Sequence, residues 1–200
     1  MYTFDMDASF IRDDKNYLMG TYARLPVEFV DAHGATLIDS EGREFLDFLG
    51  GIGAVSLGHC HPAVAKALHD QIDRIWQVGN YFYVENRSEL ARELSELLST
   101  KTDNLGHVVG STKTHWKTFF ANSGAEANEG AIKVARRWGE KNLNGAPTII
   151  SAKRSFHGRT LATLAATGQE AFHTTFLPMP EGFDVVPLND AAALEEKLEC

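Results

Sequence analysis

The chain has 200 residues, enough for one well-packed α/β domain, and its composition (44% hydrophobic, 23% charged) is that of an ordinary globular protein. A net charge of −8 argues against a nucleic-acid surface, and there is no apolar run of membrane length and no signal-peptide pattern, so we expect neither nucleic-acid nor membrane partners. Two cysteines, Cys60 and Cys200, form no disulfide framework and indicate a reducing, cytoplasmic compartment.

The first part of the chain predicts a small antiparallel meander. The segment from Met1 to about Asn16 is polar and acidic, and we expect it to lie loosely. Three short alternating stretches follow, at Val27–Ala32, Thr36–Asp39 and Glu44–Phe48, with glycine-bearing turns between them. Short strands joined by such turns are typical of a three-stranded meander.

Two amphipathic helices are expected next. Pro62 suits the first turn of a helix, and the apolar residues behind it recur at helical spacing: Val64, Leu68, Ile72, Ile75 and Trp76. Asn80–Val84 is aromatic and indicates a loop or a short strand. Ser88 has the position of a cap for a second helix, Glu89–Leu98. Residues 100–117 are polar and lack periodicity, so we expect them to be exposed.

From Trp116 onward, strands and helices alternate. The expected elements are a strand to Ala121, a helix to about Lys141, a strand at Thr148, a helix from Thr160 to about Thr167, a strand at Asp184–Leu188 and an Asp190-capped helix to the end. Alternation of this kind requires crossover connections and favours a mostly parallel sheet, which makes the expected fold class α/β. In open parallel sheets, ligands bind at the carboxyl ends of the strands.

The sequence Phe119–Glu129 leads from the first of these strands into a helix through a turn of small residues. Ser123 followed three residues later by Glu126 has the pattern of a capping box. With Ser, Gly and Ala in the first turn, no bulky side chain keeps a ligand off the backbone, and the free N–H groups and the helix dipole favour phosphate. From these residues alone, a capped helix that binds nothing is an equal alternative.

Three motifs together resemble the class III aminotransferases, which use pyridoxal 5′-phosphate (PLP). They are Asn122–Glu129, Ser155–Thr160 just after a predicted strand, and the glycine-rich Gly50–Pro62, in the order and spacing of the family. The chain is most similar to the acetylornithine aminotransferases, from about Tyr17 onward. Relative to that family, residues 100–117 are an insertion.

The resemblance implies the type I fold of PLP-dependent transferases. Residues 1–78 would hold the N-terminal segment, the small-domain meander and a linking helix, and residues 79–200 the first half of the large-domain sheet. PLP chemistry needs a lysine bonded to the cofactor and an acid at the pyridine nitrogen. In the family both come after the second half of the sheet. We therefore expect the N-terminal half of a homodimeric enzyme, inactive by itself.

The family pattern also implies roles for particular residues. Ser123, Gly124 and Ala125 would hold the cofactor phosphate through main-chain N–H groups. Phe156 would stack on the pyridine ring, and Arg159 would bind the substrate carboxylate with its planar fork. No catalytic residue is expected within the chain. The implied reaction moves an amino group from acetylornithine, or a related ω-amino donor, to 2-oxoglutarate in arginine and ornithine metabolism.

Other interpretations stay open at this point. Phe156 fits a core position and Arg159 a surface salt bridge, while His157 is expected to support its loop. His59-Cys60-His61 does not predict a metal site, because adjacent ligands cannot surround one ion tetrahedrally. A non-catalytic fragment or assembly module that keeps only the phosphate turn is the main alternative. An NAD-linked oxidoreductase fits the α/β pattern but would need a Gly-x-Gly-x-x-Gly turn that is absent.

Overall fold

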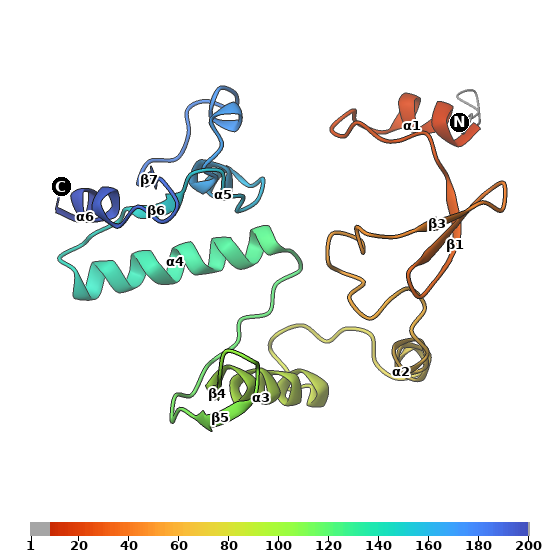
Figure 1. Ribbon diagram of the computed structural model, residues 1–200, viewed down its shortest axis with the longest axis horizontal. Helices are drawn as coiled ribbons and strands as arrows, with labels where there is room; N and C mark the ends of the chain where they lie inside the picture. Colours follow the sequence, from red (N-terminus) through yellow and green to blue (C-terminus); the bar gives the residue numbers. More distant parts are fainter. Residues whose placement is uncertain (1–8, 200) are drawn as a thin grey trace. The chain divides into compact units, whose positions relative to one another are not determined.

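The computed structural model describes residues 9–199, which divide into two compact units, one ending at Tyr83 and one beginning at Val84 (Figure 1). The first unit contains α1 (Ser9–Tyr17), β1 (Phe29–His33), β2 (Thr36–Asp39), β3 (Glu44–Leu46) and α2 (Pro62–Ile72). The second contains α3 (Glu85–Ser99), β4 (Thr100–Thr102), β5 (Val108–Ser111), α4 (Gly124–Asn142), β6 (Ile149–Ala152), α5 (Leu161–Ala166), the 3₁₀ turn η1 (Glu170–His173), β7 (Phe183–Val186) and α6 (Ala191–Glu199). Across residues 9–199, no helix is long and apolar enough to cross a membrane.

The predicted meander is confirmed: β1, β2 and β3 pair in that order, all antiparallel. The turn between β2 and β3 is built around the buried Asp39, whose carboxylate accepts hydrogen bonds from the backbone N–H groups of Glu41 (3.0 Å) and Arg43 (2.8 Å). The Arg43 guanidinium also donates to it, at 2.5 Å. Burial raises the pKa of Asp39, but the hydrogen bonds from Arg43 and Glu41 outweigh it and leave the pKa below its ordinary value.

The N-terminal segment differs from the expectation. Residues 9–17 form the helix α1, where loose chain was expected to about Asn16, while residues 1–8 lie outside the described part. An ion pair between Asp14 and Arg24 (3.1 Å) joins this helix to the segment that follows it. Within a local helix, the backbone groups of a polar segment hydrogen-bond to one another. The sequence pattern did not predict this helix because the segment lacks an apolar stripe.

Helix α2 begins at Pro62 as predicted, but it ends at Ile72, so Ile75 and Trp76 lie beyond it. The Trp76 indole N–H donates to the Ile72 carbonyl (2.6 Å), and the Gln71 side-chain amide donates to the Ile75 carbonyl (2.6 Å). These two side chains donate to carbonyls that would have accepted hydrogen bonds from backbone N–H groups if the helix had continued.

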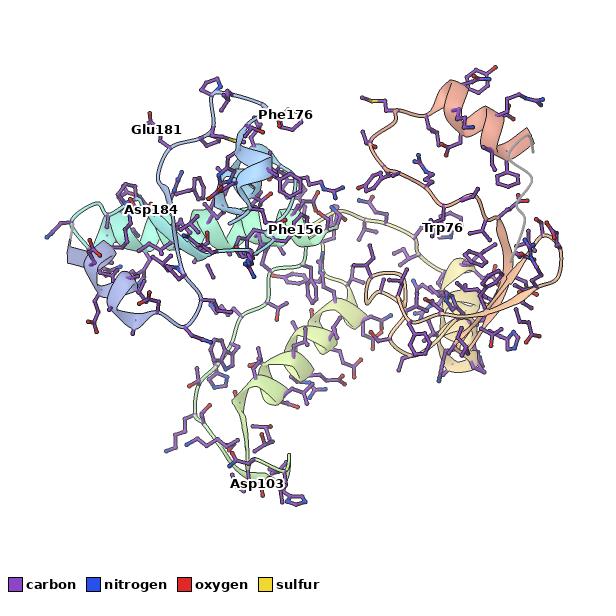
Figure 2. All side chains as sticks on the ribbon, turned by 45° about the horizontal axis from the view of Figure 1, so that its top comes forward. Trp76, Asp103, Phe156, Phe176, Glu181 and Asp184 are labelled. Carbon is purple, nitrogen blue, oxygen red and sulfur yellow. The ribbon has the colours of Figure 1, made fainter. Side chains whose placement is uncertain are left out.

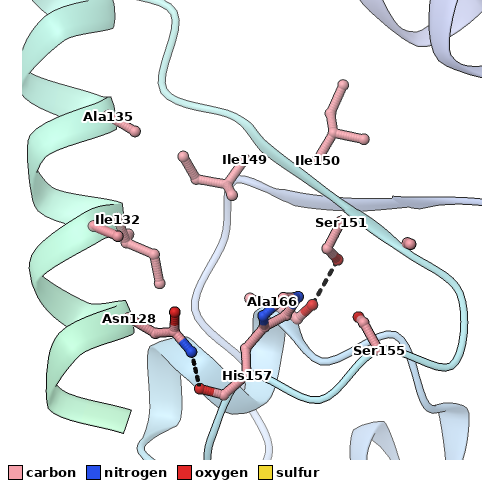
Figure 3. A pocket seen from close by; sticks show the side chains of 11 residues that line it. Asn128, Ile132, Ala135, Ile149, Ile150, Ser151, Ser155, His157 and Ala166 are labelled. Carbon is pink, nitrogen blue, oxygen red and sulfur yellow. Dashed lines mark hydrogen bonds between the residues drawn. The ribbon is translucent and has the colours of Figure 1, made fainter. Parts of the chain in front are cut away.

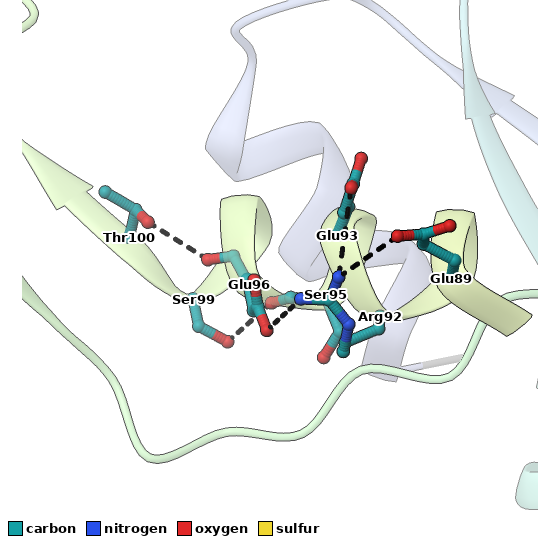
Figure 4. Close-up of polar contacts among 7 residues, drawn as sticks. All are labelled: Glu89, Arg92, Glu93, Ser95, Glu96, Ser99 and Thr100. Atoms are coloured by element: carbon teal, nitrogen blue, oxygen red, sulfur yellow. Dashed lines mark hydrogen bonds and ion pairs between the residues drawn. The ribbon is translucent and has the colours of Figure 1, made fainter.

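Helix α3 starts one turn earlier than predicted. Val84 is its N-cap residue, and Ser88 lies inside the helix with its hydroxyl near the Val84 carbonyl (3.4 Å). Along the exposed face, Arg92 pairs with Glu96 (2.9 Å) and lies within 4 Å of two further glutamates of the same helix, so the pKa of Arg92 is raised (Figure 4). The middle of the helix is therefore stabilised by the pairs of Arg92 with Glu89 and Glu96, which have i, i+3 and i, i+4 spacing.

The segment 100–117 is exposed as predicted, but part of it is ordered. Strands β4 and β5 pair as an antiparallel hairpin. At its tip, Asp103 accepts hydrogen bonds from the N–H groups of Leu105 (2.9 Å) and His107 (2.8 Å), and the pKa of Asp103 is lowered by these backbone contacts (Figure 2). The hairpin is stabilised by this local Asx-type turn, a signal that apolar periodicity does not carry.

The alternating part of the second unit contains a parallel strand pair, as predicted: β6 and β7 run in parallel, and α4 and α5 contact them. Its buried apolar residues come from both helices and from β7: Ile132, Leu164, Ala165, Ala166 and Val186. The strand predicted to end at Ala121 is not formed, since residues 112–121 are irregular. A strand needs a neighbour for its backbone hydrogen bonds, and in the described chain no strand pairs with this segment.

The turn from α4 into β6 depends on Gly139. A Cβ atom at this position would lie 2.2 Å from the carbonyl oxygen of Ala146. The Gly139 carbonyl itself accepts hydrogen bonds from the N–H groups of Leu143 (2.8 Å) and Gly145 (3.2 Å). The chain therefore folds back onto the helix at a residue that has no side chain.

We expect Gly139→Ala to destabilise the chain by about 1–3 kcal/mol, because the added methyl overlaps backbone that cannot move aside. Gly130→Ala, in the same helix, is the control: its Cβ would meet only the Phe119 ring, at 3.0 Å, and it should gain up to about 1 kcal/mol from helix propensity. Urea unfolding measures both. Equal midpoints for the two variants would contradict the steric explanation.

Candidate functional site

The N-terminus of α4 exposes bare backbone. Ser123 is the N-cap in extended conformation, and its hydroxyl accepts a hydrogen bond from the Glu126 N–H (3.2 Å). The Glu126 carboxylate accepts from the N–H of Asn122 (2.6 Å), so the reciprocal half of the predicted capping box is displaced by one residue. The N–H groups of Gly124 and Ala125, at the first two helical positions, have no acceptor within the helix. Open space lies beside Gly124, where a Cβ would meet nothing within 4 Å.

The loop after β6 lies directly on this first turn. Gly158 has φ +135°, and a Cβ on it would lie 2.8 Å from the Ala125 Cβ and 2.6 Å from the Thr163 hydroxyl. The Asn128 side-chain amide donates to the His157 carbonyl at 2.7 Å (Figure 3). The structure therefore brings together two of the three sequence motifs, Asn122–Glu129 and Ser155–Thr160.

Threonine hydroxyls anchor the two ends of this loop. Thr160 caps α5 through a reciprocal pair of hydrogen bonds with Thr163, and its hydroxyl donates to the Glu129 carboxylate. Thr167, fully buried like Thr163, accepts a hydrogen bond from the His157 N–H (3.1 Å). Sequence reasoning placed Thr160 at the start of this helix but missed the contacts of Thr163 and Thr167, although Thr160-x-x-Thr163 has the spacing of a capping box with threonine in place of glutamate.

Phe156 and Arg159 lie together on the outer side of the loop. The Phe156 side chain is 56% exposed, so it is not a core residue of the described chain. The Arg159 guanidinium carbon lies 5.8 Å from the centre of the Phe156 ring, within the range of a cation–π contact. A flat aromatic face and a planar cationic fork are thus presented beside each other.

A cavity of about 410 Å³ lies between α4 and β6, next to the loop (Figure 3). Its lining is mostly apolar, with contributions from Ile132, Ile149 and Ile150, and the Ser151 hydroxyl at its side already donates to the Ala166 carbonyl (2.6 Å). The His157 Nε2 atom is buried and has no hydrogen-bond partner among residues 9–199. Without a charged side chain, this cavity suits apolar groups rather than a phosphate or a carboxylate.

The third motif lies in the first unit and is held by its own contacts. Asp47 accepts hydrogen bonds from His59 Nε2 (2.7 Å) and from the N–H groups of Leu49 and Gly50 (2.9 Å each). The hydrogen bond from His59, with those backbone contacts, lowers the pKa of Asp47. Gly58 packs against Gly34, where a Cβ would lie 3.0 Å from the carbonyl oxygen. Within the described residues, no group of three His, Cys, Asp or Glu side chains could hold a metal ion.

Together, the residues at the start of α4 fit a phosphate group. Two main-chain N–H groups without an acceptor within the helix, a serine hydroxyl and an unobstructed approach beside Gly124 are the elements of an anion site at a helix N-terminus. The exposed Phe156 face and the Arg159 fork stand on a loop that contacts the same turn through Gly158. The arrangement suits a ligand that carries a phosphate, an aromatic ring and a nearby carboxylate.

Comparison with known proteins gives a consistent result. The family model described as "Aminotransferase class-III" matches residues 19–200. The chain is 46% identical over 187 residues to acetylornithine aminotransferase of Caldanaerobacter subterraneus subsp. tengcongensis, covering 93% of this chain and 44% of that protein. For the Synechocystis enzyme of the same name, the identity is 43% over 188 residues, with 93% and 40% covered.

Solved structures agree on the fold. Ornithine aminotransferase from Toxoplasma gondii ME49 superposes with a TM-score of 0.81 at 28% identity, over 95% of this chain and 42% of that one. Acetylornithine aminotransferase from Elizabethkingia anophelis gives 0.69 at 28% identity, over 95% and 40%. The chain thus spans less than half the length of the relatives it matches.

We expect Gly124→Val to weaken binding of inorganic phosphate about tenfold, because the branched side chain covers the N–H groups of the first turn. Gly124→Ala, which adds only one methyl into open space, should bind nearly as well as the wild type. Phosphate titrations followed by the amide NMR shifts of Ser123, Gly124 and Ala125 measure this. Shifts confined to other residues would place the anion elsewhere.

Proposed function

The chain belongs to the class III aminotransferase family, and we propose that it forms the part of such an enzyme that binds the phosphate and ring of PLP and the carboxylate of the substrate. The observation that carries the proposal is the contact of Gly158 with Ala125, which joins the phosphate-type turn and the Phe156–Arg159 loop into one site. Structural similarity to aminotransferases at TM-scores of 0.69 to 0.81 supports the corresponding α/β transferase fold.

Each of the proposed residues has a physical task. The N–H groups of Ser123, Gly124 and Ala125 bind the phosphate, aided by the dipole of α4. The exposed face of Phe156 stacks on the cofactor ring, a contact of about 0.5–1.5 kcal/mol beyond burial. Arg159 binds a substrate carboxylate with two parallel hydrogen bonds. When bound, PLP supplies the electron sink that makes proton loss from the amino-bearing carbon feasible.

The proposed reaction transfers the amino group of acetylornithine, or a related ω-amino donor, to 2-oxoglutarate, in arginine and ornithine metabolism. The names of the curated relatives support this donor class. In the proposal, residues 1–78 belong to the small domain and residues 79–200 to the large one. The complete enzyme is a cytoplasmic homodimer, and its PLP-bonding lysine lies outside these 200 residues.

A second candidate is a non-catalytic assembly module that keeps only the phosphate turn. The number of exposed large apolar side chains in both units favours it. Large apolar side chains such as Phe48, Leu97 and Phe119 are more than two-thirds exposed. Association with another chain would cover this apolar surface and stabilise the protein, whether or not it takes part in catalysis.

We expect the isolated chain to be no better a transaminase than free PLP. The loss of a positioned general base alone costs about 10²–10⁴-fold in rate. Borohydride reduction of the purified chain with PLP, followed by peptide mass mapping, should give scattered, substoichiometric labels on exposed lysines such as Lys133 and Lys141. A single lysine labelled stoichiometrically, together with turnover well above free PLP, would show that the catalytic lysine is in this chain.

Arg159→Lys should raise KM for both the amino donor and 2-oxoglutarate by about tenfold in the assembled active enzyme, because lysine keeps the charge but loses the bidentate geometry. Arg154→Lys, an exposed arginine of the same segment, is the matched control and should leave KM unchanged. Steady-state kinetics with both substrates measure the effect. Loss of PLP with normal substrate affinity would instead assign Arg159 to the cofactor.

A further inference from the structure

Two adjacent polar side chains of α4, Asn128 and Glu129, contact the loop that carries Phe156 and Arg159. They follow Gly124 and Ala125 by four residues, so each lies on the same side of the helix as one residue of the phosphate turn. Both are partly buried, unlike most polar residues of this helix. Neither has a role in the phosphate, ring or carboxylate contacts proposed above.

Their contacts with the loop follow one pattern. Asn128 donates to the carbonyl of His157, the residue that follows Phe156, at 2.7 Å. Glu129 accepts from the hydroxyl of Thr160, the residue that follows Arg159, at 2.5 Å. The residue directly after Phe156 and the residue directly after Arg159 are therefore each hydrogen-bonded to a side chain of α4.

Between these two attachment points the loop touches the helix backbone. Gly158 has no room for a Cβ over Ala125, so the loop cannot lift or slide without losing this contact as well. An exposed loop otherwise has considerable conformational freedom, and a binding group that must first be ordered contributes less to affinity. Two hydrogen bonds, one of them to a carboxylate, are sufficient to restrict such a segment.

We propose that Asn128 and Glu129 are positioning residues that fix the Phe156 and Arg159 side chains relative to the phosphate turn of α4. The inference rests on the proposed function and deepens it. It separates the site into a phosphate turn that works without these contacts and a ring- and carboxylate-binding loop that depends on them.

The test uses Asn128→Ala and Glu129→Ala in the 200-residue chain, with Asn142→Ala and Glu140→Ala as controls. The control residues are an asparagine and a glutamate of the same helix whose side chains bond to Trp138 and Arg137, away from the loop. Three quantities are measured: hydrogen exchange of the amides of residues 156–160, the Kd for inorganic phosphate and the Kd for PLP. Circular dichroism verifies that each variant keeps its helices.

In each of the two test variants, exchange in the loop should rise and PLP affinity fall by about three- to tenfold, the effect of one lost hydrogen bond. The Kd for inorganic phosphate should stay within about twofold of the wild type, a split that general destabilisation would not produce. Both control variants should behave as the wild type. Glu129→Gln, which keeps an acceptor for Thr160, should recover most of the lost PLP affinity.

If the wild-type chain binds PLP but the test variants show unchanged loop exchange or unchanged PLP affinity, the positioning role is overturned and the proposed function is not. Equal losses for phosphate and PLP would also overturn it, because they would indicate damage to α4 as a whole. A wild-type chain that binds neither phosphate nor PLP would overturn the proposed function itself, and this inference with it.

Discussion

The close contact of Gly158 with Ala125 is the constraint on which the candidate site depends. Two segments about thirty residues apart in sequence meet there with backbone against the first turn of a helix, and no side chain fits between them. Because the loop lies so near, Asn128 can reach the His157 carbonyl and Thr160 can reach Glu129. A residue with a Cβ at position 158 would displace the loop and lengthen both hydrogen bonds at once.

The second unit shows why a short buried region can still define a local structure. Its described residues include five buried apolar side chains, two of them alanines, and three of the five are neighbours on the six-residue helix α5. Two fully buried hydroxyls complete this region by hydrogen-bonding to the backbone: that of Thr163 accepts from the Thr160 N–H, and that of Thr167 accepts from the His157 N–H and donates to the Thr163 carbonyl. Polar groups that are fully satisfied inside a small core specify one arrangement of the chain, which apolar contacts alone do not.

Local signals in the sequence predicted much of this architecture. The meander, the start of α2, the helix after Ser123 and the Asp190 cap, whose carboxylate accepts from the Ala193 N–H at 3.0 Å, all depend on residues close together in the chain. The prediction of a strand ending at Ala121 was wrong, because a strand requires a neighbouring strand as hydrogen-bond partner and no local sequence pattern reveals one. The contacts of Asn128 and Glu129 were missed for the same reason, since each joins residues about thirty positions apart.

The spacing within α4 makes the candidate site sensitive to insertions and deletions. The proposed phosphate turn and the residues that hydrogen-bond to the loop are separated by one helical turn, so their relative direction is set by the number of residues between them. A single inserted or deleted residue between Ala125 and Asn128 would rotate one group relative to the other by about 100°. Side-chain substitutions at positions 126 and 127 leave this direction unchanged, whereas a change in the number of residues would not.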